Sequence, residues 1–216
     1  YARGVIIGQQ TFGKGTVQNL YSLDQYLRSD DDHGFGQMTL TIGKYYRVTG
    51  ESTQHRGVNP DIALPSHINA ELIGESVRDS ALPWDTVATT RFRAGKPLDS
   101  TIESLTVSHA ERAKTDPNFK FQMDMIAAAE EMTAEKTVTL SKAERLAEHE
   151  QQLQRRLDRE NQRRAALDLE PVESLDDIEP DDIPDILLDQ AAGIVTDLAT
   201  LREIASKPPQ TAQANP

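Results

Sequence analysis

The chain has 216 residues, 37% hydrophobic and 27% charged, so its length permits one large or two small domains with a polar surface. The formal net charge of -12 argues against nucleic acid or anionic membrane as a partner, because both bind clustered positive charge. The absence of cysteine excludes disulfides, thiol catalysis and thiolate zinc sites, and no apolar run approaches the roughly 18 residues that span a bilayer.

Residues 1–66 read as strands and turns. The apolar run 5–8 is typical of a short strand covered on both faces. Residues 16–23 alternate between polar and apolar, and residues 37–48 combine the same alternation with β-branched and aromatic side chains. We therefore expect three strands in this part of the chain.

Lys14 lies between Gly13 and Gly15, which predicts a turn that orients the lysine side chain towards another group. One interpretation is a solvated lysine in a hairpin. A second is a phosphate loop, since residues 8–14 match most of that motif, but residue 15 is not the required Ser or Thr and the next segment is not helical. The third is a catalytic lysine, whose pKa burial would lower towards neutrality.

Two segments that contain aspartate could suggest functional sites. The run 30–33 places three aspartates beside His33, but the spacing of the side chains is poor for a metal and favours a solvated loop. Asp61, in the segment Asn59-Pro60-Asp61, could be a functional carboxylate, although capping of local amides after a proline turn is favoured.

The composition changes near residue 67, and the strand pattern ends there. Residues 67–100 are predicted to be a linker packed on the preceding domain, with Trp84, the only tryptophan, as its anchor. Residues 101–206 form a helical C-terminal domain by pattern, and residues 207–216 are a Pro, Gln and Ala tail predicted to be disordered.

Local signals place the helices of this domain. Asp116 with the following proline predicts an N-terminus, and Ser141 opens a long charged helix that runs to about Leu169. Met123 and Met132 are interpreted as core residues. After an acidic linker, the segment 185–205 has the strongest amphipathic pattern, with Leu187, Ala191, Ile194, Leu198, Leu201 and Ala205 on one face.

The lysine motif resembles that of the carboxy-terminal processing proteases, which are serine peptidases with a Ser-Lys dyad. The segment that carries the resemblance is 11–18, TFGKGTVQ, and later segments follow in the family's order: YYRVTG at 45–50, STQ at 52–54 and RGVNPDI at 56–62. The sequence ALPWD at 81–85 and the helical tail are similar to the tail-specific proteases of the Gram-negative periplasm, a branch of that family.

The resemblance implies a fold and two site residues. The fold would be α+β, the end of an α/β serine protease core made mainly of strands, followed by the mostly helical domain. Lys14 would be the general base and Gln18 the polar residue that positions it, and an even spacing along an extended segment puts both on one face. None of the thirteen residues before Lys14 is a serine. We therefore expect the nucleophile upstream, in a larger polypeptide, and no activity from this chain alone. The resemblance also implies a PDZ module upstream.

The same resemblance implies endoproteolysis of proteins with apolar C-terminal tails, with no cofactor. It implies a periplasmic protein that could associate with the inner membrane, a lipoprotein adaptor as partner, and cell-wall enzymes as substrates. An alternative stays open: a non-catalytic interaction module, in which the strands act only as a scaffold and the helical domain binds a partner.

Overall fold

The computed structural model describes residues 1–26, 34–68 and 72–206, without the side chains of residues 204–206. The predicted aspartate loop at 30–33, the predicted tail at 207–216 and the side chain of Ala205 lie outside that description. The chain forms two compact units, one from residues 1–63 and 68–96 and the other from residues 64–67 and 97 onwards. The α+β fold is confirmed, while the predicted boundaries at residues 66 and 100 stay predictions.

The described part of the first unit contains two small sheets. Strand β1 (Ile7–Gly8) pairs in parallel with β4 (Ile62–Ala63). The amide of Ile6 donates to the Asp61 carboxylate at 2.8 Å, so Asp61 anchors the start of β1, as a structural residue would. Ile6 is 43% exposed, and the prediction of a strand covered on both faces is therefore wrong within this chain.

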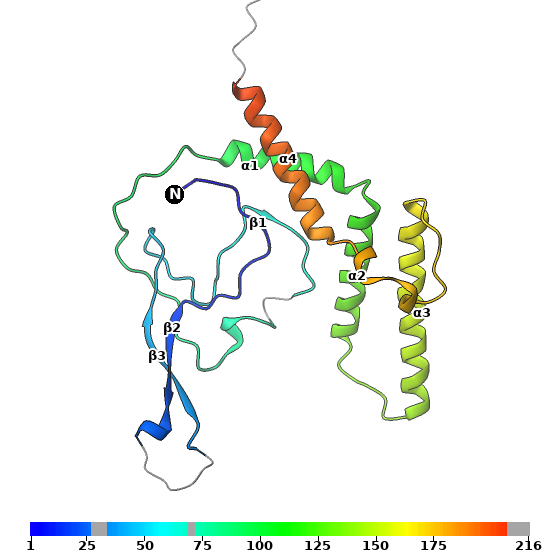
Figure 1. Cartoon of the computed structure of the whole chain (residues 1–216), viewed down its shortest axis with the longest axis horizontal. Coiled ribbons are helices and arrows are strands. Elements are labelled where there is room, and N and C mark those ends of the chain that lie inside the picture. Colours follow the sequence, from blue (N-terminus) through cyan, green and yellow to red (C-terminus); the bar gives the residue numbers. More distant parts are fainter. Residues whose placement is uncertain (27–33, 69–71, 207–216) are drawn as a thin grey trace, which may run out of the picture. The chain divides into compact units, whose positions relative to one another are not determined.

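Strands β2 (Thr16–Ser22) and β3 (Gln37–Lys44) form the second sheet, an antiparallel hairpin that Figure 1 shows as two strands running side by side. The alternating sequence pattern predicts both strands correctly. The register shifts between Val17 and Gln18, which pair with Gly43 and Thr41, so that Ile42 has no direct partner on β2. Apolar side chains remain exposed along the hairpin, at Val17, Leu20, Met38, Leu40 and Ile42.

The four α-helices found in the described residues belong to the second unit: α1 (Asp99–Ala113), α2 (Pro117–Ala134), α3 (Lys142–Ala166) and α4 (Ile186–Ser206). The predicted N-caps are confirmed. The Asp116 carboxylate accepts from the backbone amides of Asn118 and Phe119, and the Ser141 hydroxyl accepts from the amide of Glu144. Two 3-10 turns, Leu175–Asp177 and Pro180–Asp182, occupy the acidic segment before α4.

The core of this unit lies between α1, α2 and α4, as the crossing of α4 over α1 in Figure 1 indicates. Leu105 and Ile194 have no exposed surface, and Ile126 is 8% exposed. Met123 and Met132 are 44% and 58% exposed, so the interpretation of these methionines as core residues is wrong. Among the described residues, none of the helices combines the length and the hydropathy needed to cross a bilayer.

Candidate functional site

The two glycines around Lys14 are required by a close approach of the segment 11–15 to the segment 52–57. Gly13 has φ of +90°, and a Cβ atom there would lie 2.8 Å from the carbonyl oxygen of His55. A Cβ atom at Gly15 would lie 2.6 Å from the backbone nitrogen of Gln54. Side chains at either position would therefore push the lysine segment away from its neighbour.

Hydrogen bonds hold the backbone of Lys14 on both sides. The amide of His55 donates to the carbonyl oxygen of Gly13 at 2.8 Å. The carbonyl oxygen of Lys14 accepts from the Tyr45 hydroxyl at 2.5 Å and from the Thr53 hydroxyl at 3.5 Å. These contacts come from segments 30 to 40 residues away, so the fold itself fixes the position of the lysine backbone.

The side chain of Lys14 is exposed, in contrast to its anchored backbone. The expectation that burial would desolvate this amine is therefore not met within this chain. Gln18 is exposed as well, and its side-chain amide donates to the Thr41 hydroxyl on β3 at 3.2 Å. Across the described ranges, no hydrogen bond joins the side chains of Lys14 and Gln18, so the positioning of Lys14 by Gln18 stays a prediction.

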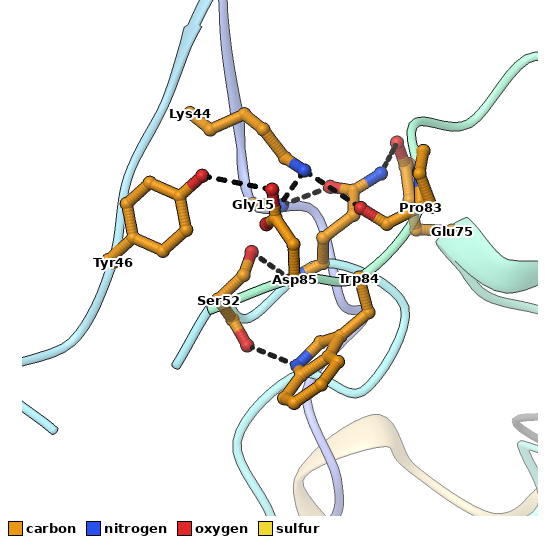
Figure 2. Close-up of polar contacts among 9 residues, drawn as sticks. Gly15, Lys44, Tyr46, Ser52, Glu75, Pro83, Trp84 and Asp85 are labelled. Carbon is orange, nitrogen blue, oxygen red and sulfur yellow. Dashed lines mark hydrogen bonds and ion pairs between the residues drawn. The ribbon is translucent and has the colours of Figure 1, made fainter. Parts of the chain in front are cut away.

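A buried amide and a buried carboxylate lie behind the lysine segment. The side chain of Gln54 has no exposed surface, and its Oε1 atom accepts from the amide of Gly15 at 2.7 Å. Its Nε2 atom donates to Oε1 of Glu75 at 3.1 Å, and Glu75 is 5% exposed. Figure 2 shows Gly15 and Glu75 at the two ends of this chain of hydrogen bonds. The sequence interpretation gave neither residue a role, although Gln54 belongs to one of the family-like segments.

A second polar cluster joins β3 to the segment 81–85 (Figure 2). The Lys44 ammonium donates to the Asp85 carboxylate at 2.9 Å and to the carbonyl oxygen of Pro83 at 2.8 Å. The Tyr46 hydroxyl donates to the other carboxylate oxygen of Asp85 at 3.2 Å. The hydrogen bond from Lys44 is the largest cause of the lowered pKa of Asp85.

Trp84 anchors the same segment from its other side. The indole nitrogen donates to the carbonyl oxygen of Ser52 at 2.9 Å, and the guanidinium of Arg56 lies 3.6 Å from the ring centroid. The prediction that Trp84 attaches this segment to the preceding strands is confirmed within the first unit.

The phosphate-loop interpretation does not fit the structure. Such a loop needs backbone amides at the N-terminus of a helix, where the helix dipole favours negative charge. The residue that follows the lysine segment, Thr16, instead begins strand β2. A solvated lysine and a catalytic lysine both remain compatible with this geometry.

Comparison with known proteins decides the family. Residues 68–200 match the family described as the C-terminal domain of tail specific protease, and residues 1–64 match peptidase family S41. The chain belongs to the tail-specific protease family. The S41 match ends at residue 64, close to where the match to the C-terminal domain begins at residue 68, so together they account for most of the chain.

Individual tail-specific and processing proteases agree with this assignment. The chain is 35% identical over 201 residues to the tail-specific protease of Haemophilus influenzae, a match that covers 91% of this chain and 29% of that protein. It is 34% identical over 77 residues to the carboxy-terminal-processing protease of Bartonella bacilliformis, covering 36% of this chain and 16% of that protein. The chain is thus the C-terminal region of a tail-specific protease sequence and spans less than a third of the length of these relatives.

Proposed function

We propose that this chain supplies Lys14 as the general base of a Ser-Lys endopeptidase, whose nucleophilic serine and oxyanion hole belong to a part of the protein outside this chain. The observation that carries the proposal is the contrast at Lys14 between an anchored backbone and a free amine. A general base must reach its proton donor with little loss of position, and a fixed backbone with an available side chain meets that need.

Lys14 accepts a proton and then returns it in each half of the reaction. The neutral amine of Lys14 takes the proton of the serine hydroxyl while the serine oxygen bonds to the scissile carbonyl carbon. When the C–N bond breaks, the ammonium returns that proton to the leaving amine. In the second half of the reaction, Lys14 takes a proton from the water that attacks the ester carbon and returns it to the serine oxygen when the ester C–O bond breaks. Because only a neutral amine accepts a proton and Lys14 is exposed in this chain, the rest of the protein would have to desolvate it.

Gln18 is proposed to orient the Lys14 amine in the assembled site. In this chain its side-chain amide donates to Thr41, and it would have to exchange that contact for Lys14 when the upstream segment is in place. Substrates with apolar C-terminal tails, a periplasmic location with contact to the inner membrane, a lipoprotein adaptor and cell-wall enzymes as targets belong to the same proposal. They rest on the family resemblance.

The test compares cleavage of a reporter protein with an apolar C-terminal tail by several proteins. These are this chain alone, a longer protein that carries the upstream segment, and that longer protein with Lys14→Ala or Lys136→Ala. Lys136 is an exposed lysine in the second unit and serves as the matched control. We expect cleavage only by the longer protein and its Lys136→Ala variant. Activity of the Lys14→Ala variant would show that Lys14 is not the base.

A second candidate function is a non-catalytic interaction module. Helix α3 favours it, because over 25 residues it buries only Glu160 and Arg163 and leaves a long polar surface free within its unit. An inert longer protein, with correct folding shown by circular dichroism, would favour this second function over the peptidase.

A further inference from the structure

We infer that Gln54 and Glu75 are positioning residues for Lys14, which hold the backbone on both sides of the lysine without touching its side chain. The inference rests on the proposed role of Lys14 as general base. It adds to that role a buried pair of side chains, 21 residues apart in the sequence, that the fold brings behind the lysine segment.

Both polar groups of the Gln54 side chain, its carbonyl oxygen and its amide nitrogen, form hydrogen bonds. The amide of Gly15 requires an acceptor, and the Glu75 carboxylate requires a donor, so the orientation of the Gln54 side-chain amide follows from its neighbours. Its own backbone amide donates to the Ser52 hydroxyl at 3.0 Å. With no exposed surface, Gln54 cannot exchange these bonds for water.

Glu75 holds the N-terminal side of the lysine segment through hydrogen bonds. Its backbone amide donates to the carbonyl oxygen of Phe12 at 3.0 Å, while its Oε1 atom accepts from Gln54. Through these bonds the pair holds Phe12 and Gly15, which flank Lys14 on its two sides.

The carboxylate of Glu75 is costly to bury, which argues for a specific use. Among the described residues, its second oxygen, Oε2, is buried without a hydrogen bond, and its ion-pair partner is the largely exposed guanidinium of Arg78 at 4.0 Å. A buried carboxylate with incomplete partners lowers the stability of the fold. Its presence therefore points to a role that outweighs this loss. Holding the amide of Gln54 in one orientation is the function that the contacts of Glu75 indicate.

The hydrogen-bond pattern can be tested by exchanging the amide of Gln54 and the carboxylate of Glu75. Gln54→Glu places two carboxylates against each other, which repel and displace the lysine segment. Adding Glu75→Gln restores the pattern, because an acceptor again faces the amide of Gly15 and an amide donor again faces a carboxylate. The matched control is Gln25→Glu, which makes the same chemical change at an exposed position of the first unit.

The variants are made in the longer protein with the upstream segment, and kcat and KM are measured separately on the reporter substrate. We expect Gln54→Glu to lower kcat by roughly 10²-fold with little change in KM, because a base displaced by about 1 Å loses about that much. The double variant should recover kcat to within about tenfold of the unsubstituted protein, and Gln25→Glu should leave it unchanged.

Two results would overturn the positioning role: full kcat in Gln54→Glu, or a folded double variant no more active than Gln54→Glu. If Gln54→Glu alone does not fold, the double variant still decides, since restored hydrogen bonds must restore both folding and kcat. A Lys14→Ala protein that keeps its activity would instead refute the proposed base. An inactive Lys14→Ala protein beside a fully active Gln54→Glu would refute only the positioning role.

Discussion

Replacing Gly15 by alanine tests how tightly the lysine segment lies against its neighbour. The added Cβ atom would lie 2.6 Å from the backbone nitrogen of Gln54, 3.1 Å from its Cα atom and 2.9 Å from the Ser52 hydroxyl. Two of these three atoms are backbone, so rotation of a flexible side chain cannot relieve the overlap. The segment must therefore move away from Gln54.

The expected loss of stability has two parts. Overpacking of a tight contact costs about 1–3 kcal/mol. Moving the segment also breaks the buried hydrogen bond from the Gly15 amide to Gln54, which costs about 1–3 kcal/mol more when the acceptor is left without a partner. The two parts are not fully additive, and we expect a combined loss of about 3 kcal/mol in the free energy of unfolding of the first unit.

Urea unfolding of the 216-residue chain, followed by tryptophan fluorescence, measures this loss. Trp84 is the only tryptophan and is hydrogen-bonded to Ser52, next to the altered contact. With an m value of about 1.5 kcal/mol/M, a loss of about 3 kcal/mol lowers the urea midpoint by about 2 M. The circular dichroism signal at 222 nm, recorded in parallel, reports the helices of the second unit.

Gly43→Ala is the matched control, because a Cβ atom there meets nothing within 4 Å and the residue lies in strand β3. We expect its midpoint to stay within about 0.3 M of the unsubstituted chain, as for substitutions without a structural cost. Equal midpoints for Gly15→Ala and Gly43→Ala would refute the close approach at Gly15 and, with it, the argument for two obligatory glycines around the lysine.

Two further predictions concern the helical unit. Leu105→Ala, at a position in α1 with no exposed surface, should lower the free energy of unfolding by about 2–5 kcal/mol in urea titrations at 222 nm, whereas Val107→Ala, 59% exposed on the same helix, should cost less than about 1 kcal/mol. The pKa of His109 is lowered by its burial and by the charge of Arg112, so the unfolded chain binds this proton more readily and stability should fall as the pH drops below about 6.5. His109→Gln should reduce the fall in melting temperature between pH 7.5 and 5, while His149→Gln, at an exposed site, should not; equal pH profiles for the two variants would contradict the burial argument.

Signals between near neighbours in the sequence determined much of the fold. The Asp116-Pro117 pair and Ser141 set the starts of two helices, because a cap needs only its own side chain and the next few amides. Alternation predicted β2 and β3 for the same reason, since side chains on a strand repeat every two residues. The glycines around Lys14 predicted a turn, which the structure does not form at residues 11–15; there the glycines instead allow the close approach to residues 52–57.

Only the tertiary structure decided what surrounds the lysine segment. Gln54 and Glu75 lie 39 and 60 positions after Gly15. No spacing rule in the sequence predicts that the Gln54 side chain accepts a hydrogen bond from the backbone amide of Gly15. The exposure of Lys14 is also a tertiary result, because burial depends on what packs against a residue and not on the glycines beside it. The sequence alone thus determined the elements and the family-like lysine motif. The fold determined which distant side chains hold the lysine, because hydrogen bonds between segments form only where the folded chain brings a donor and an acceptor together.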